Sequence, residues 1–380
     1  MDTALKVVLY SSFAILGYTY LGYPLLLALW ARFGRSLVRK AEATLSVTVV
    51  IAAWNEAVRI KDRLNDCLAQ EYPECLLDVV VVSDGSTDGT ERVVKSIGSS
   101  RIRLLALEHR MGKAFALNQG VMAAGGEIIV FTDARQRFSR TAVKALVENF
   151  SDPKVGAVTG DLVLDESRNG GVRSHAGGLY WKMEKWIRKN EGAIDSVIGV
   201  TGAIYAVRRA LFRPLPSGAI LDDLLTPMHI AMQGYRIAFE ARALAFDSVT
   251  PDYRAEFSRK VRTLAGNYQA ISVCPDLLLP WRNRLFFQFV SHKICRLIAP
   301  LCMLLLLLAN LGVRTGWLKI LLMMQIAGYG LALAGWGFRT IGIQDRWTAP
   351  AFTFCLFNFA ALLGAVRFLR SQTISWGKTS

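Results

Sequence analysis

Acidic side chains follow three short, apolar, β-branched runs of this chain. They are Glu56 after residues 46–52, Asp84 after residues 77–82, and Asp133 after residues 127–132. A single Asp after a strand is most often a helix cap. Three acids that meet at one edge of a sheet repel one another unless a cation or a donor-rich ligand lies among them. A hard divalent ion with oxygen ligands, carrying a phosphate, would relieve that repulsion.

The segments that must position these acids alternate between strand and helix patterns. A helical pattern follows the first run up to Gln70, a further strand is expected at Ile102–Leu107, and a second helical pattern covers Lys113–Ala124. This alternation predicts a doubly wound, mostly parallel α/β sheet. Ligands bind such sheets at the carboxyl ends of the strands, where the three acids would converge.

Composition and motifs exclude several classes of protein. The chain has 380 residues, of which 52% are hydrophobic and 20% charged, so it is neither disordered nor a small disulfide scaffold. The six cysteines lie far apart and form no C-x-x-C pair, which leaves little for a zinc site. The first strand–helix turn carries neither a P-loop nor a G-x-G-x-x-G motif, which disfavours those nucleotide-binding folds.

The hydrophobic residues concentrate at the two ends of the chain. Four segments are long and apolar enough to cross a bilayer: Leu5–Trp30, Ile294–Val313, Trp317–Phe338 and Ala349–Val366. We therefore expect three regions, namely an N-terminal transmembrane helix with its basic flank in residues 1–40, a cytoplasmic domain in residues 41–280, and a C-terminal membrane region in residues 281–380. Trp281–Lys293 is either an interfacial helix or the basic start of the next span.

Basic residues indicate the orientation in the membrane. Arg32, Arg35, Arg39 and Lys40 follow the first segment, which favours a retained helix over a signal peptide and places residues 41–280 in the cytoplasm, as in a bacterial inner membrane protein. Three C-terminal spans would put Arg367, Arg370 and Lys378 outside, against the positive-inside trend. Either one segment is re-entrant or interfacial, or the tail is an exception.

Several motifs resemble those of glycosyltransferase family 2, and in particular its membrane-embedded branch that includes poly-N-acetylglucosamine, hyaluronan and cellulose synthases. The resemblance runs from about Val47 to Gln269 and implies a GT-A fold. Its motifs are the N-E turn at Asn55-Glu56, the D-G-S-x-D-x-T motif at residues 84–90, the G-K-x-x-A-L-N-x-G segment at residues 112–120, the D-x-D position at residues 133–135, the E-D pair at Asp222-Asp223, and the Q/R-x-x-R-W motif at residues 259–263. Arg135 replaces the second acid of D-x-D, and Thr263 replaces the Trp.

The resemblance implies a nucleotide-sugar donor, most simply a UDP-sugar. Asn55, Glu56, Asp84 and Lys113 would belong to the donor site, with Glu56 and Asp84 on the base and ribose. Asp133 would hold a Mg²⁺ or Mn²⁺ that bridges the two phosphates and neutralises the leaving group.

The same resemblance assigns the reaction to two further groups of residues. Asp223, beside Asp222, would be the general base that deprotonates the acceptor hydroxyl in one inverting displacement; the alternative is that both acids simply favour the start of a helix. Arg259 and Arg262, one helical turn apart, would bind the diphosphate. The alternative is that they contact lipid head groups.

Fewer residues of the sequence match motifs of the acceptor site. Thr201-Gly202 resembles the acceptor-site turn of the family, whereas an ordinary turn before a strand would look the same. Tyr180 and Trp181, with Glu184 and Trp186, lie at helical spacing, a pattern more typical of packing than of a sugar-binding surface.

Three functions remain open at this stage. The first is a synthase that extends a β-linked polysaccharide, for which four spans would need an oligomer or an export partner. The second is a single transfer to a lipid or lipid-linked acceptor, favoured by Thr263. The third is a non-catalytic nucleotide-binding membrane subunit, favoured by Arg135 and disfavoured by Asp223. The net charge of +15 suits anionic lipid and a diphosphate, and no basic stripe interleaved with aromatics indicates nucleic acid.

Overall fold

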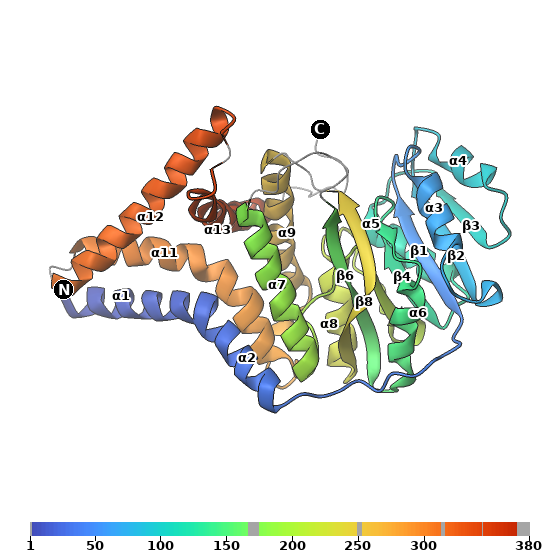
Figure 1. Ribbon diagram of the computed structural model, residues 1–380, viewed down its shortest axis with the longest axis horizontal. Helices are drawn as coiled ribbons and strands as arrows, with labels where there is room; N and C mark the ends of the chain where they lie inside the picture. The colour runs from blue at the N-terminus through green and yellow to red at the C-terminus, as the bar shows by residue number, and fades with distance from the viewer. Residues whose placement is uncertain (1, 166–174, 249–252, 313–315, 344, 371–380) are drawn as a thin grey trace.

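The computed structural model describes residues 2–165, 175–248, 253–312, 316–343 and 345–370. Lys378, which bears on the orientation of the tail, lies outside these residues. The described residues form a sheet flanked by helices on one side of the molecule and a group of long apolar helices on the other (Figure 1).

One eight-stranded sheet organises the central domain. Its strands, in chain order, are β1 (Val47–Ala53), β2 (Leu77–Asp84), β3 (Ile102–Leu107), β4 (Ile128–Thr132), β5 (Arg137–Phe138), β6 (Val155–Asp165), β7 (Tyr205–Arg208) and β8 (Arg236–Ser248). They lie in the order β3-β2-β1-β4-β7-β6-β8-β5. The first four are mutually parallel, β6 is parallel to β8, and β7 and β5 run antiparallel to their neighbours. The predicted mostly parallel sheet is confirmed.

Helices cover both faces of the sheet because its central strands are apolar on both sides. All seven residues of β1 are buried. Val49 and Ile51 pack in one core with α3 (Ile60–Leu68), α4 (Thr90–Ser96) and α6 (Ala142–Val147). Val50 and Ala52 pack in the other core with α5 (Lys113–Ala123) and α8 (Asp222–Met232). A continuous apolar run is what a strand buried on both faces requires.

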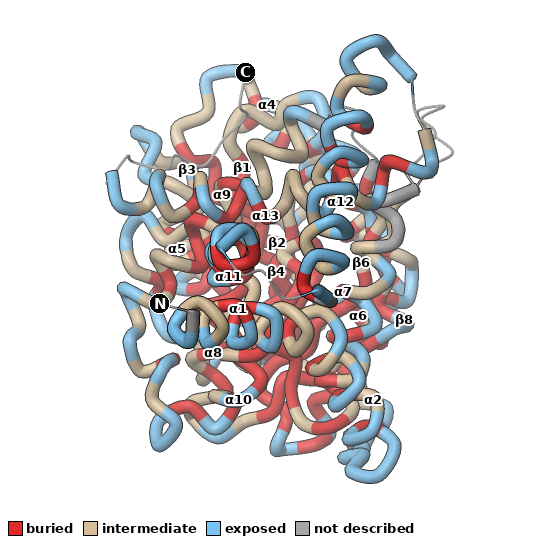
Figure 2. Tube along the Cα trace, turned by 90° about the vertical axis from the view of Figure 1, so that its left-hand side faces the viewer, coloured by how far each residue is buried: buried red, intermediate tan, exposed pale blue. Residues whose placement is uncertain are grey.

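Four helical segments are long and apolar enough to cross a membrane: Thr3–Phe33, Phe286–Gly312, Leu318–Thr340 and Ala349–Leu369. They comprise α1 (Asp2–Gly17) and α2 (Tyr23–Phe33), joined by a π-turn at Tyr18–Gly22; α10 (Phe286–Phe289) and α11 (Cys295–Gly312), joined by a π-turn at Val290–Ile294; α12 (Gly316–Thr340); and α13 (Ala349–Leu369). Much of α12 is exposed to its surroundings (Figure 2). The four predicted membrane segments, one N-terminal and three C-terminal, are confirmed, and a membrane protein follows.

Helices α7 (His175–Ile194) and α9 (Tyr253–Val273) lie between the sheet and the apolar helices (Figure 1). A buried polar network joins α7 to the spans. His292 contacts Glu191 through Nδ1 at 2.7 Å and Glu184 through Nε2 at 3.0 Å, and Tyr23 donates to Glu191 at 2.8 Å. Because a half-satisfied buried network is costly, these partners fix how α2, α7 and the start of α11 sit together.

The segment Trp281–Lys293 contains no separate helix in this structure. From Phe286 the chain is helical without a break to Gly312, so the second of the two interpretations, the start of the spanning helix, describes Phe286–Lys293. The π-turn gives this helix its bend, and Ser291 within it contacts Tyr18 of the first π-turn at 2.6 Å between their hydroxyl oxygens. The boundaries at residues 40 and 280 stay predictions.

Candidate active site

The predicted acids lie at one edge of the sheet because their strands are parallel and in register. Ala53 of β1 pairs with Ser83 of β2, and Ile51 pairs with Thr132 of β4. β7 runs antiparallel to β4, and its first residue, Tyr205, pairs with Phe131. The start of β7 therefore meets the ends of the other strands, which brings the turn before it to the same edge.

The N-E turn is held by the D-G-S-x-D-x-T loop. Asn55 has a positive φ of 53°, a conformation that Asn tolerates better than most residues, and its Oδ1 accepts the Thr87 N–H at 2.9 Å. The Glu56 N–H donates to Thr90 at 2.9 Å. Asn55 therefore positions the turn, while the Glu56 side chain is partly exposed and pairs with Arg59 at 3.3 Å.

Asp84 is fully buried at the end of β2. Its two oxygens accept the backbone N–H groups of Met111 at 2.7 Å and Gly112 at 2.9 Å. It thus holds the loop that leads into α5 and to Lys113. Direct contact between Asp84 and a nucleoside stays a prediction. The buried position of this side chain does not support that contact.

Lys113, at the start of α5, lies between two carboxylates. Its Nζ is 3.1 Å from Asp133 and 3.1 Å from Asp222. Burial alone would lower the pKa of Lys113, but Asp133, Asp222 and the neighbouring Asp223 raise it above its ordinary value. Burial likewise would raise the pKa of Asp133, yet Lys113 lowers it. We call Lys113, Asp133, Asp222 and Asp223 the strand-end cluster.

Asp222 and Asp223 open α8, as predicted from the sequence, and their environments differ. Asp222 is buried, and besides Lys113 it accepts the Tyr205 hydroxyl at 3.1 Å. Asp223 is less buried. Burial first, and then the negative charge of Asp222, raise the pKa of Asp223 to about 6. A carboxylate with this pKa is ionised at neutral pH and still basic enough to take a proton from a reacting group.

The turn at Thr201-Gly202 lies against Asp223. A Cβ on Gly202 would come 3.5 Å from Asp223 Oδ2, so the glycine leaves the carboxylate accessible from this side. Pro227 inside α8 has no N–H to donate to the Asp223 carbonyl one turn earlier. That carbonyl accepts the Val200 N–H at 2.8 Å instead, which fixes the turn to the helix that carries Asp223.

The three arginines of the predicted motifs each have a different acidic neighbour. Arg262 on α9 lies close enough to Asp133 to help lower its pKa. Arg259, one turn earlier, pairs with Glu256 at 3.2 Å. Arg135, at the second position of D-x-D, pairs with Asp247 at the end of β8, at 3.2 Å.

Asp133 suits a divalent metal that arrives with a substrate better than a resident one. Among the described residues, no group of three His, Cys, Asp or Glu side chains could hold a metal ion. Asp133 is a carboxylate whose side chain is 31% exposed at the strand-end edge. Mg²⁺ is commonly bound by one or two carboxylates together with substrate phosphates, and the single Asp133 fits that mode.

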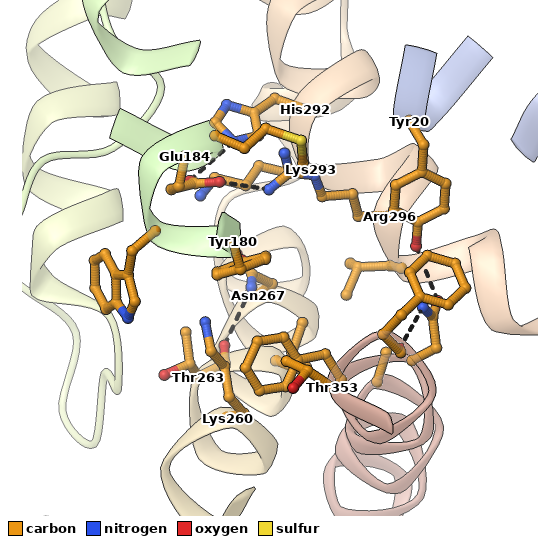
Figure 3. A pocket seen from close by; sticks show the side chains of 18 of the residues that line it. Tyr20, Tyr180, Glu184, Lys260, Thr263, Asn267, His292, Lys293, Arg296 and Thr353 are labelled. Atoms are coloured by element: carbon orange, nitrogen blue, oxygen red, sulfur yellow. Dashed lines mark hydrogen bonds and ion pairs between the residues drawn. The ribbon is translucent and has the colours of Figure 1, made fainter. Parts of the chain in front are cut away.

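The sequence analysis set aside Tyr180 and Trp181 as packing residues and did not single out Lys293. In the structure these side chains line a cavity of about 430 Å³ enclosed by α7, α9, α13 and the bent start of α11, which we call the interhelical cavity (Figure 3). The spacing of the aromatics is the same for packing and for lining a cavity, so only their mixture with charged residues such as Glu184 and Lys260 signals the difference.

Comparisons with known proteins agree with this architecture. Residues 48–214 match the family model "Glycosyl transferase family 2". Two curated relatives are named poly-beta-1,6-N-acetyl-D-glucosamine synthase: one from Staphylococcus epidermidis strain RP62A, 24% identical over 248 residues, and one from Staphylococcus aureus strain COL, 25% identical over 232 residues. The matches cover 63% and 59% of this chain and 59% and 55% of the relatives, so less than two thirds of their length is spanned.

A solved structure extends the likeness to the membrane helices. The mannosyltransferase from Pyrobaculum calidifontis, determined in complex with GDP-Man and Mn²⁺, matches 97% of this chain and 100% of its own with a TM-score of 0.75 at 23% identity. The chain therefore has the fold of a GT-A glycosyltransferase with membrane helices. The match of residues 48–214 to the family model agrees with the resemblance to glycosyltransferase family 2 that the sequence motifs indicate.

Proposed function

We propose that this protein is an inverting membrane glycosyltransferase that moves a sugar from a nucleotide-sugar donor, a UDP-sugar in the simplest case, to the hydroxyl of a β-linked saccharide acceptor. The observation that carries the proposal is the strand-end cluster. A carboxylate with a pKa of about 6 lies beside an ammonium and a second carboxylate at the ligand-binding edge of a family 2 domain.

The reaction needs a base and a stabilised leaving group. Asp223 accepts the proton of the acceptor hydroxyl, and the oxygen of that hydroxyl forms the new bond to the anomeric carbon. The bond from that carbon to the phosphate oxygen breaks on the opposite face, so an α-linked donor gives a β-linkage. Lys113 and Arg262 are the cations placed to neutralise the departing diphosphate.

The donor lies along the strand ends in this proposal. Glu56 contacts the nucleoside, whereas Asn55 and Asp84 hold the two loops that shape its site. Asp133 binds a Mg²⁺ or Mn²⁺ ion, which supplies charge neutralisation at the diphosphate. The mannosyltransferase solved with Mn²⁺ supports a divalent ion. Thr201-Gly202 borders the acceptor beside Asp223, and Arg259 lies farther out beside Glu256.

The names of the curated relatives favour a polysaccharide as the product. In this proposal the domain lies in the cytoplasm at a bacterial inner membrane, and an oligomer or export partner completes a pore. Thr263 favours a second candidate, a single transfer to a lipid-linked acceptor. It lines the interhelical cavity, where the synthases that the chain resembles carry the aromatic residue of their motif.

Release of UDP tests the proposal. Purified full-length protein is given UDP-glucose, UDP-N-acetylglucosamine and other nucleotide sugars with Mg²⁺ or Mn²⁺. We expect one donor to give UDP, and Asp223→Asn to lower the rate about 10³-fold, since a general base contributes roughly 10²–10⁴-fold. The variant should still bind UDP.

Two outcomes would contradict parts of the proposal. No UDP release with any donor, while Asp223→Asn still binds UDP, would mean a non-catalytic nucleotide-binding subunit. Asp133→Ala should abolish the stabilisation that Mn²⁺ adds to UDP in a thermal-unfolding assay; an unchanged response would place the metal elsewhere. The length of the product on a gel separates a polymerase from a single transferase.

A further inference from the structure

The interhelical cavity is lined by residues of the glycosyltransferase domain on one side and of the membrane helices on the other. Its volume of about 430 Å³ is in the range of sites for small ligands. In Figure 3, Glu184, His292 and Lys293 lie at one end, Lys260 and Thr263 at the other, and Tyr180 between them.

Positive charge dominates this cavity. Four Arg or Lys side chains and one carboxylate line it: Arg188, Lys260, Lys293, Arg296 and Glu184. Burial would raise the pKa of Glu184, but Arg296 and His292 hold it well below its ordinary value. Glu184 is therefore ionised. Its oxygens already pair with Arg296 at 2.6 Å, His292 at 3.0 Å and Arg188 at 3.8 Å.

Two ammonium groups in the cavity have no carboxylate partner among the described residues. Lys293 makes no hydrogen bond or ion pair with the part of the chain that the structure describes. Lys260 lies over aromatic rings, 4.3 Å from the centroid of Tyr180 and 4.7 Å from that of Phe357. The Nε of Arg188 is also buried without a hydrogen-bond partner. Both lysines are half-buried, and a partly desolvated ammonium is stabilised by a nearby anion, so this arrangement favours an anionic ligand.

The cationic end of the cavity borders the proposed base. A Cβ on Gly199 would come 3.5 Å from the carbonyl oxygen of Asp223 and 3.9 Å from Nζ of Lys293. Lys293 and Arg188 both reach Asp223 electrostatically. A molecule whose anionic group occupies this end therefore presents its neighbouring atoms to Asp223.

The remaining wall is apolar and comes largely from helices that can span a membrane. Leu297 of α11 and Pro350, Phe354, Phe357 and Ala361 of α13 line it. A neutral oligosaccharide would gain little from four cations, whereas a free phosphate would gain nothing from this wall. A phosphate group attached to a long apolar chain matches both.

We propose that the interhelical cavity binds the phosphate of a lipid-linked acceptor at its Lys293 end, with the apolar wall along the lipid chain. This inference rests on the proposed glycosyl transfer and names the acceptor class for it. Thr263 contributes by being small: the cavity remains open where a Trp would fill it.

Binding of a long-chain prenyl phosphate to the full-length protein in phosphatidylcholine nanodiscs tests the inference. The same prenol without phosphate, inorganic phosphate and a soluble β-linked N-acetylglucosamine oligomer are the comparison ligands, and the shift of the unfolding temperature reports binding. We expect the prenyl phosphate to bind at least tenfold more tightly than any of the three. Lys293→Met should weaken it about tenfold, as expected for a lost charge-assisted contact, and Lys260→Met, at the other end of the cavity, should weaken it less.

The controls separate binding from folding. Lys182→Met removes an exposed ammonium from the same α7 that carries Trp181, outside the cavity, and should leave the affinity unchanged. Lys293→Arg keeps the charge and should retain most of the affinity. Unchanged binding in Lys293→Met, equal binding of inorganic phosphate, or protection by the oligomer alone would each overturn the inference.

The two proposals fail in different ways. Binding of prenyl phosphate without UDP release from any donor would leave the cavity assignment standing and overturn the glycosyl transfer. UDP release without binding of prenyl phosphate would do the reverse.

Discussion

The strand-end cluster, which includes Asp223, and the interhelical cavity have opposite charge. The cluster contains three carboxylates around one ammonium, whereas the cavity contains four cations around one carboxylate. An acid-rich pocket suits a donor that brings a cation with it, and a cation-rich pocket suits an acceptor that brings an anion. In the proposed reaction, Asp223 is the group that both substrates must reach.

The comparison also shows how each region is stabilised without ligands. In the cluster, Lys113 itself relieves the repulsion between Asp133 and Asp222. In the cavity, Glu184 relieves part of the repulsion among the cations, and aromatic rings hold Lys260. The cluster therefore keeps an excess of negative charge, and the cavity keeps an excess of positive charge.

Replacing Lys113 by Met should have the largest effect. It leaves Asp133 and the buried Asp222 without their shared partner, which costs about 3 kcal/mol of unfolding free energy, and it removes a cation from the departing diphosphate, worth roughly 10²–10³-fold in turnover. Thermal unfolding and UDP release measure the two effects. Lys113→Arg, the matched control, should restore stability more fully than turnover. Intact turnover in a destabilised Met variant would reduce Lys113 to a structural role.

Replacing Thr263 by Trp tests the cavity. The larger side chain would fill part of the space that Thr263 leaves open, so acceptor-dependent turnover should fall about tenfold, by roughly 1.4 kcal/mol of acceptor binding, while UDP binding is unchanged. Thr340→Trp, at the exposed end of α12, is the control. Faster turnover or a longer product in the Thr263 variant would show that an aromatic surface for a growing polysaccharide was the missing element.

The pH dependence of turnover links the two regions. Asp223 acts only when ionised, so kcat/KM should rise with pH, reach half its maximum near the pKa of about 6, and level off above it. Burial and Asp222 raise this pKa, and Lys293 lowers it. Lys293→Met should therefore move the rising limb to higher pH, and Asp222→Asn to lower pH. An unshifted limb in both variants would mean that a group other than Asp223 is titrating.

The sequence predicted the sheet and the strand-end acids well because both depend on local patterns. The parallel strands follow from apolar runs such as Val47–Ala53, and parallel register alone brings Asp84 and Asp133 to one edge. The strands from β5 onward were harder to predict, since β7 and β5 run antiparallel and are only four and two residues long.

The cavity could not be predicted, because it depends on contacts between segments far apart in the chain. Tyr180 and Trp181 meet Lys260 and Phe357 only after α7, α9 and α13 pack together. The structural roles of Asn55 and Asp84 could not be predicted either. A motif indicates that a residue is important, but it does not indicate whether the residue contacts a ligand or stabilises a loop. Here Asp84 binds two backbone N–H groups of the loop before α5.

Arg135→Ala should have the smallest effect. Arg135 replaces the second acid of D-x-D, but its guanidinium pairs with Asp247 at 3.2 Å and its side chain is 42% exposed. Exposed ion pairs contribute about 0–1 kcal/mol, so stability should change little and turnover should stay within about twofold. Thermal unfolding and UDP release, each with Mn²⁺, measure this, with Arg59→Ala at the pair with Glu56 as the control. A tenfold loss of affinity for UDP in the Arg135 variant alone would mean that Arg135 turns to the diphosphate when the donor binds, and the strand-end cluster would then need a second cation to balance its acids.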